Sequence, residues 1–199
     1  ITLDRRFFWA AKTDPNFDAF RLQVDALLNQ LTQQARFRAE EEMASARLTI
    51  EKMDCWHAKE TAPSEYRSAL TTITKAKERF HAGSYFGYVD AERLATEART
   101  RAETAIGYQE TRMKQDIDDL RNTAIQVLRD LRDLHAGQRS RTMLETALAD
   151  SEKGAFLSTI TPSAPVSTYQ SYNQVQTLLR RSVSIGISSI RQSLNVQKR

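Results

Sequence analysis

The chain has 199 residues, a net charge of +4, 40% hydrophobic and 27% charged residues, and only 6 Gly and 4 Pro. Few helix breakers and abundant Ala, Glu, Arg, Gln and Leu are typical of long helices, so the composition predicts an all-α fold. No apolar run reaches roughly 18 residues, so no transmembrane segment is predicted. The single cysteine, Cys55, excludes an intramolecular disulfide.

Residues 1–13 form the first predicted segment, an N-terminal aromatic anchor. Phe7, Phe8 and Trp9 are adjacent and follow two arginines. Three large rings in a row cannot all enter one small core, so we expect them to contact the protein's own helices or a neighbouring subunit. A membrane interface, where aromatic and arginine side chains also meet, is the alternative.

Residues 14–160 are predicted to form an elongated bundle or hairpin of long, coiled-coil-like helices. The first helix is expected to start at Asp14, which can cap it, with Pro15 in the first turn, and to end near Trp56. Small or apolar residues recur along it at helical spacing. They are Val24, Leu27, Leu31, Ala35, Ala39, Met43, Ala46, Ile50 and Met53.

A shorter helix is predicted to follow, from Pro63 to a turn at Gly83. Proline is tolerated in a first turn, and glycine adopts the left-handed backbone that often ends a helix. Thr61 and Ser64 are the candidate caps. The predicted apolar face consists of Tyr66, Ala69, Leu70, Ile73, Ala76 and Phe80. This helix and the next are expected to lie antiparallel.

The longest predicted helix runs from Tyr88 to His135, and its apolar stripe changes midway. The first half carries small residues that let a neighbouring backbone approach closely. They are Ala91, Ala95, Ala98, Ala102 and Ala105. The second half carries a nearly regular heptad row. It comprises Met113, Ile117, Leu120, Ala124, Val127, Leu131 and Leu134. The register slips at Gly107, where we expect a bend or a change of packing partner.

A capped helix is predicted next, with Ser140 as its cap. Its apolar face contains Met143, Leu144, Ala147 and Leu148. Three apolar residues that follow are expected in a loop docked on another surface. They are Phe156, Leu157 and Ile160.

Residues 161–199 are predicted to be a Pro-containing linker, Thr161 to Thr168, followed by a basic amphipathic helix. Its apolar stripe comprises Tyr172, Val175, Leu179, Val183, Gly186, Ile190 and Leu194. A short strand near Val183 is the alternative, since Gly186 weakens a helix.

This last segment contains all of the excess positive charge. Its basic residues are Arg180, Arg181, Arg191, Lys198 and Arg199, and it has no Asp or Glu. Removing these five from the 29 basic and 25 acidic residues leaves a charge of −1 for residues 1–160. Two interpretations of this segment stay open. It contacts an anionic surface, namely an acidic protein, lipid head groups or RNA, or it is a solvated polar helix that packs its apolar stripe on the helical hairpin.

Candidate catalytic groups are few. Cys55 precedes His57 by two residues, and residues so spaced on a helix point in different directions, so a structural thiol is the preferred interpretation. His57, His81 and His135 are isolated and lack metal-ligand spacing. No glycine-rich phosphate loop is present. The sequence predicts no enzyme activity, no cofactor and no metal site.

A helix as long as residues 88–135 cannot bury its apolar stripe alone, so packing partners are expected, either elsewhere in this chain or on another chain. We predict a non-catalytic structural or scaffold subunit of a larger multi-protein assembly. The residues predicted to contact partners are Phe7, Phe8, Trp9, Met113, Ile117, Leu120, Leu131, Arg180, Arg181 and Arg191.

The expected setting is an organellar, membrane-associated complex, such as a respiratory, ATP-synthase or ribosomal assembly on the mitochondrial matrix side. The excess of Arg over Lys, 21 against 8, and an N-terminus that begins with Ile1 rather than Met favour this setting and a processed chain. Two alternatives stay open. One is an RNA- or anionic-membrane-binding module that acts through residues 161–199, and the other is a phage or bacterial envelope coiled-coil protein.

Overall fold

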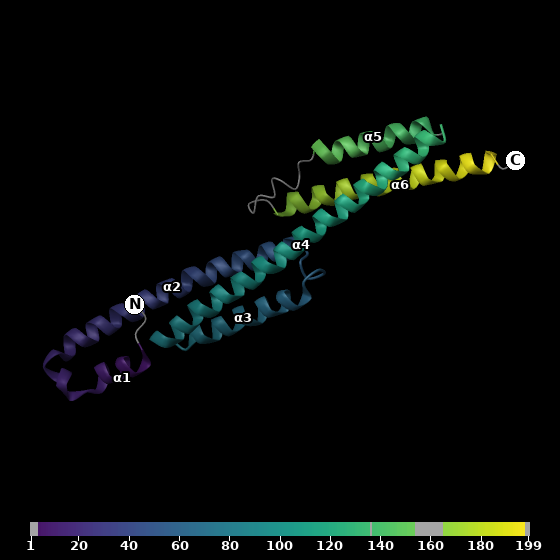
Figure 1. The fold of residues 1–199 in the computed structure, drawn as a ribbon. Helices are drawn as coiled ribbons and strands as arrows, with labels where there is room; N and C mark the ends of the chain where they lie inside the picture. The colour runs from purple at the N-terminus through teal and green to yellow at the C-terminus, as the bar shows by residue number, and fades with distance from the viewer. Residues whose placement is uncertain (1–3, 136, 154–164, 198–199) are drawn as a thin grey trace. The chain divides into compact units, whose positions relative to one another are not determined.

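The computed structural model describes residues 4–135, 137–153 and 165–197, which form six α-helices, one 3-10 helix and no strand (Figure 1). In chain order the elements are α1 (Arg5–Thr13), η1 (Pro15–Phe20), α2 (Arg21–Cys55), α3 (Pro63–His81), α4 (Tyr85–Asp133), α5 (Gln138–Lys153) and α6 (Pro165–Gln197). The all-α prediction is confirmed for these residues.

The start of the first long helix differs from the prediction. Asp14 does act as a cap, but its carboxylate accepts from the Asn16 backbone N–H at 2.9 Å to begin the 3-10 helix η1. Asn and Asp side chains compete for backbone hydrogen bonds and disfavour a regular helix, which explains the short irregular element. The long helix α2 therefore begins at Arg21.

Two predicted caps are also wrong. Ala62 is the N-cap of α3 and makes no side-chain cap bond, while Pro63 is the first helical residue. Helix α5 begins at Gln138, before Ser140, whose hydroxyl instead bonds the Ser189 hydroxyl at 2.6 Å. The turn at Gly83 is confirmed, with a left-handed φ of 65°.

The boundaries of two later helices also move. Helix α4 begins at Tyr85, and its end precedes His135, which has a positive φ of 52°. The last four residues of the predicted linker, 165–168, belong to α6, because Pro165 is tolerated at a helix start. Residues 161–164 and the predicted docked loop residues, Phe156, Leu157 and Ile160, lie outside the described part of the chain.

The chain divides into two compact units. Unit 1 comprises Ile1–Asp54 and Ala58–Ile106, and unit 2 comprises Cys55–His57 and Gly107–Arg199. Helix α4 continues without interruption through the boundary and contributes to both units. The change of packing partner predicted at Gly107 is thus confirmed. The predicted segments 1–13, 14–160 and 161–199 remain predictions.

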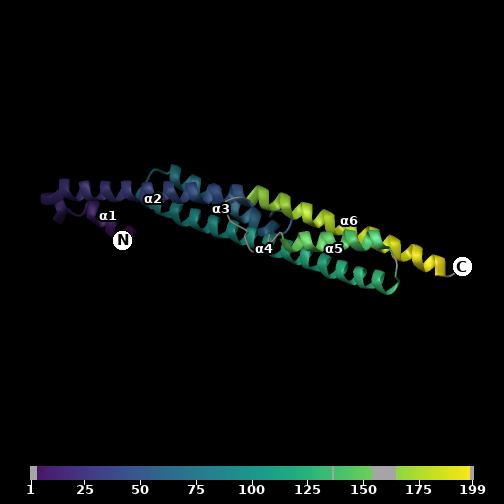
Figure 2. The same cartoon turned by 90° about the horizontal axis from the view of Figure 1, so that it is seen from above.

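Unit 1 packs α2, α3 and the first part of α4 side by side (Figure 2). Its core is rich in alanine, and the predicted small-residue stripe of α4 is fully buried in it. Arg99 of α4 donates to Glu42 of α2 at 2.8 Å, and Arg101 of α4 to Glu65 of α3 at 3.4 Å. Alanine at the contacts allows three helices to approach closely, with ion pairs along the edges.

Two apolar positions in unit 1 were assigned to the wrong face. Leu27 and Leu70 are exposed, whereas Leu28, next to Leu27, and Thr72, two residues after Leu70, are buried. The stripe of α2 was extended in steps of three and four from Val24, but α1 covers this end of the helix and Leu28 faces the resulting cleft. A tertiary contact therefore decides which face is buried.

Unit 2 packs the second part of α4 with α5 and α6. Met113, Ile117, Val127 and Leu131 are buried in it, as helical spacing predicts. Gly186 lies where α6 meets both other helices, because a Cβ there would be 2.5 Å from Val127 Cγ1 and 3.0 Å from Leu144 Cδ1. The residues around Val183 are helical, which rejects the strand alternative.

None of the helices over the described residues has both the length and the apolar character needed to cross a bilayer.

Candidate functional site

Helix α1 is attached to the start of α4 by an aromatic cluster. The Phe8 ring stacks on Tyr85, with centroids 5.3 Å apart, and meets Phe86 edge-on at 5.3 Å. Arg5 Nη2 donates to Asp90 Oδ2 at 3.1 Å, and the same guanidinium lies 5.2 Å from the centre of the Phe86 ring. Stacking, an ion pair and a cation–π contact therefore fix the first turn of α1.

Arg21 holds the other end of α1. Its Nη1 donates to the carbonyls of Ala11 at 3.0 Å and Lys12 at 2.8 Å. Its Nη2 donates to the carbonyl of Asp14 at 2.9 Å and to Asp18 Oδ1 at 2.5 Å. The first two are carbonyls from the last turn of α1, where the helix dipole is negative, so the guanidinium satisfies groups that otherwise lack partners.

This arrangement exposes a set of large apolar side chains, which we call the N-terminal aromatic surface. It consists of Phe7, Trp9, Phe17, Phe20, Leu22 and Leu27. These six side chains come from α1, η1 and the start of α2, and they are between 39% and 84% exposed. Single exposed apolar residues are ordinary, but six within 21 consecutive residues make this end of unit 1 a candidate region for binding.

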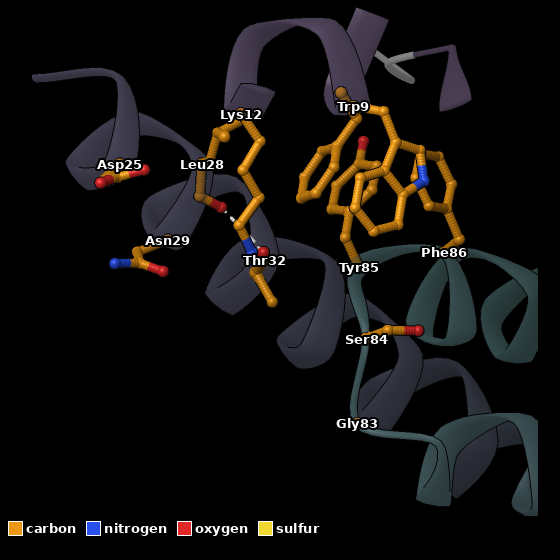
Figure 3. A pocket seen from close by; sticks show the side chains of 11 residues that line it. Trp9, Lys12, Asp25, Leu28, Asn29, Thr32, Gly83, Ser84, Tyr85 and Phe86 are labelled. Atoms are coloured by element: carbon orange, nitrogen blue, oxygen red, sulfur yellow. Dashed lines mark hydrogen bonds between the residues drawn. The ribbon is translucent and has the colours of Figure 1, made fainter. Parts of the chain in front are cut away.

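Beside this surface, α1, α2 and the turn before α4 enclose a cleft of about 620 Å³ (Figure 3). Its aromatic wall contains Phe8, Trp9, Tyr85 and Phe86, and α2 contributes the buried Leu28. The polar groups that line it come from Lys12, Asp25, Asn29, Thr32 and Ser84. Apolar walls with a few polar groups are the usual character of ligand-binding clefts.

Two of these polar groups are already engaged within the chain. Thr32 Oγ1 donates to the Leu28 carbonyl at 2.8 Å, and Ser84 Oγ accepts from the Gly87 backbone N–H at 3.1 Å. Lys12, Asp25 and Asn29 make no side-chain hydrogen bond or ion pair with any residue that the structure describes.

The predicted contact residues of α4 occupy a different environment. Met113, Ile117 and Leu131 are buried inside unit 2, and Leu120 is half-buried. Their stripe is covered by other parts of unit 2, so a partner would reach it only if this unit opened. Phe8 is likewise half-buried, because its ring serves to attach α1.

The arginines of α6 are available at the surface. Arg180, Arg181 and Arg191 are exposed, and none forms an ion pair with another described residue. Nearby, Tyr172 is buried and donates to Asp116 Oδ2 at 3.0 Å. Burial and this hydrogen bond raise the pKa of the Tyr172 phenol.

The sequence-predicted chemical groups do not assemble into a reactive site. Cys55 is a free, half-buried thiol at the end of α2. His57 follows with a positive φ of 53°, and its ring lies 4.5 Å from the Tyr169 ring, centre to centre. Over the described ranges, no three His, Cys, Asp or Glu side chains are grouped so that they could hold a metal ion.

Sequence reasoning missed Arg21, Lys12, Asp25, Tyr85 and Phe86 as parts of one site. The adjacent Tyr85 and Phe86 directly after the predicted Gly83 turn were the available signal. Comparisons of the chain with protein-family models, with curated proteins and with solved structures find no match.

Proposed function

We propose that this chain is a non-catalytic structural subunit of a multi-protein assembly and that its N-terminal aromatic surface binds a protein partner. The concentration of exposed aromatic and aliphatic side chains between Phe7 and Leu27 supports this proposal. Aromatic residues are enriched at the energetically dominant positions of protein interfaces. Burying their apolar surface stabilises a complex by about 25 cal/mol per Å² before the costs of association are subtracted.

The attachment of α1 favours such a role. The Arg5 and Phe8 contacts at one end and the Arg21 hydrogen bonds at the other order this helix before any partner arrives. Preordered side chains lose less conformational entropy on binding than mobile ones, so the complex gains affinity.

Two finer predictions, on the shape of the chain and on its cellular compartment, are also part of this proposal. These are an elongated, coiled-coil-like arrangement and membership of an organellar complex. Small-angle X-ray scattering of the purified chain tests the shape, and fractionation of the source cells tests the compartment. Self-association through Met113–Leu134, which an envelope coiled-coil protein would require, is less favoured because five residues of this row are buried within unit 2. They are Met113, Ile117, Ala124, Val127 and Leu131.

A matched pair of variants tests the protein-binding surface. The triple variant Phe7→Ser, Phe20→Ser, Leu22→Ser removes three exposed apolar side chains from it. The control Phe37→Ser, Leu48→Ser removes two apolar side chains of α2 that are each 60% exposed and lie outside this surface. We expect native co-purification to recover the same partner with the wild-type chain and the control, and the triple variant to lose it. Equal recovery with all three chains contradicts the proposal.

A second candidate function is binding to an anionic surface through α6, because three exposed arginines there lack ion-pair partners among the described residues. The variant Arg180→Gln, Arg181→Gln, Arg191→Gln is expected to weaken binding to RNA or to anionic vesicles. With three contacts, the binding constant should fall with salt to a power of roughly 2 to 3. Binding by the wild-type chain that shows no salt dependence contradicts this candidate.

A further inference from the structure

The cleft in unit 1 has the dimensions of a small-molecule site. Its volume of about 620 Å³ lies inside the range of roughly 300 to 1,000 Å³ that such sites occupy. The rings of Phe8, Tyr85 and Phe86 pack against one another with centroids 5.0 to 5.3 Å apart, which makes this wall rigid. Figure 3 shows the Trp9 indole on the same side of the cleft. One wall is therefore suited to a flat aromatic group.

The other side of the cleft carries a cation and an anion. Lys12 extends from α1, and Asp25 and Asn29 come from successive turns of α2 (Figure 3). Lys12 and Asp25 form no ion pair with each other or with any other described residue. Each therefore retains its full capacity to bind a charged group of a ligand.

These features together restrict the chemistry of the ligand. A ligand with only a negative charge would leave Asp25 without a counter-charge in the cleft lining, and a ligand with only a positive charge would leave Lys12 without one. A ligand with both charges satisfies both side chains, and an apolar ring uses the aromatic wall. We propose that this cleft binds a small aromatic zwitterion of the chemical class of the free aromatic amino acids. Trp9 belongs to both this cleft and the N-terminal aromatic surface, but ligand binding is measured on the chain without a partner, so failure of one proposal is distinguishable from failure of the other.

Trp9 supplies a direct measurement of binding. The chain has two tryptophans, and Trp56 is buried in unit 2, so the variant Trp56→Phe leaves Trp9 as the single reporter. Titration of this full-length variant with L-phenylalanine is expected to change the Trp9 emission and reach saturation. Calorimetry on the wild-type chain gives the same affinity without any substitution.

Three related compounds each lack one feature of the ligand. N-acetylphenylalanine has no ammonium group, phenylalaninamide has no carboxylate, and alanine has no ring. We expect each to bind about tenfold more weakly than L-phenylalanine, the factor that corresponds to about 1.4 kcal/mol. Equal affinities for all four compounds overturn the proposed recognition.

Two variants assign the charged contacts. Lys12→Met is expected to abolish the preference for L-phenylalanine over phenylalaninamide, and Asp25→Asn the preference over N-acetylphenylalanine. The control Lys77→Met removes an exposed lysine of α3 that does not line the cleft and should change neither. The proposal is overturned if L-phenylalanine shows no saturable binding to the wild-type chain up to about 10 mM. It is equally overturned if both cleft variants keep the wild-type affinity.

Discussion

At Gly186 in unit 2, the neighbouring side chains leave no space for a Cβ atom. An alanine Cβ there would lie 2.5 Å from Val127 Cγ1, and the β-branched valine has little freedom to move away. Overpacking costs about 1 to 3 kcal/mol, against a gain of about 1 kcal/mol from replacing a helical glycine. We predict that Gly186→Ala lowers the free energy of unfolding by about 1 kcal/mol, measured by urea denaturation.

Gly107 provides the matched control, because it is also helical and nothing lies within 4 Å of the position its Cβ would occupy. An alanine at this position gains helix propensity without any overpacking cost. We therefore predict that Gly107→Ala stabilises the protein by about 1 kcal/mol. If both substitutions shift stability in the same direction, the packing around Gly186 is not as tight as described.

Tyr172 should make stability depend on alkaline pH. Burial, and then its hydrogen bond to Asp116, raise its pKa above the ordinary value of 10.0, so the folded state retains a proton that the unfolded state releases. The stabilisation is complete below about pH 10 and is lost as pH rises above it, by about 1.4 kcal/mol per pH unit. Between about pH 10 and pH 11, we predict a smaller loss for Tyr172→Phe than for the wild type.

Circular dichroism during urea unfolding at each pH measures this difference. The comparison uses slopes against pH, because Tyr172→Phe also removes a hydrogen bond and lowers stability at every pH. Parallel curves for the two proteins would show that the phenol titrates alike in the folded and unfolded states.

The residue patterns predicted which residues of the helices are buried better than they predicted the structural role of each residue. The alanine stripe from Ala91 to Ala105 is buried as predicted, because its spacing depends only on helix geometry. Gly186 was interpreted as a weakness in a helix, yet it allows three helices to meet. Its role depends on Val127 and Leu144, which are distant in the sequence.

At the level of elements, a single guanidinium holds the last turn of α1. Arg21 makes four hydrogen bonds, to three backbone carbonyls and one carboxylate. We predict that Arg21→Met speeds amide hydrogen exchange in residues 5–13 and lowers the free energy of unfolding by about 1 to 2 kcal/mol. The control Arg36→Met breaks only an exposed pair with Glu40, so it should lower the free energy of unfolding less than Arg21→Met does.

The amide hydrogen exchange rates of residues 5–13 show whether Arg21→Met loosens α1 alone or destabilises the whole of unit 1. Faster exchange there with unchanged rates in α3 supports the role of Arg21 in holding α1. Uniformly faster exchange throughout unit 1 would instead mean that Arg21 supports the whole unit.

The N-terminal elements could not be predicted from periodicity. Residues 15–20 follow Asp14 and carry Asn16 and Asp18, so local hydrogen bonds replace the α-helical pattern. The cleft combines Lys12 and Asp25 with Tyr85. The rest of α2 and all of α3 separate Asp25 from Tyr85 along the chain. Only the tertiary fold brings these groups together, so the sequence signal for the candidate site was limited to the adjacent Tyr85 and Phe86.

At the level of the whole molecule, one helix belongs to two units. The slip at Gly107 is visible in the sequence because a small-residue stripe gives way to a large-residue stripe, and each type of stripe suits a different neighbour. All buried residues of the hydrophobic core that contains the alanine stripe belong to unit 1. Separate cores predict separate cooperative units, even where the backbone of α4 is continuous.

Two methionines test this independence. Met53 is buried in unit 1 and Met113 in unit 2. Truncation to alanine should cost about 2 to 5 kcal/mol at either site. We predict that Met53→Ala lowers the hydrogen-exchange protection of α3 and leaves that of α6 unchanged, and that Met113→Ala does the reverse. If each variant lowers protection in both units by the same factor, α4 couples the two cores into one cooperative structure.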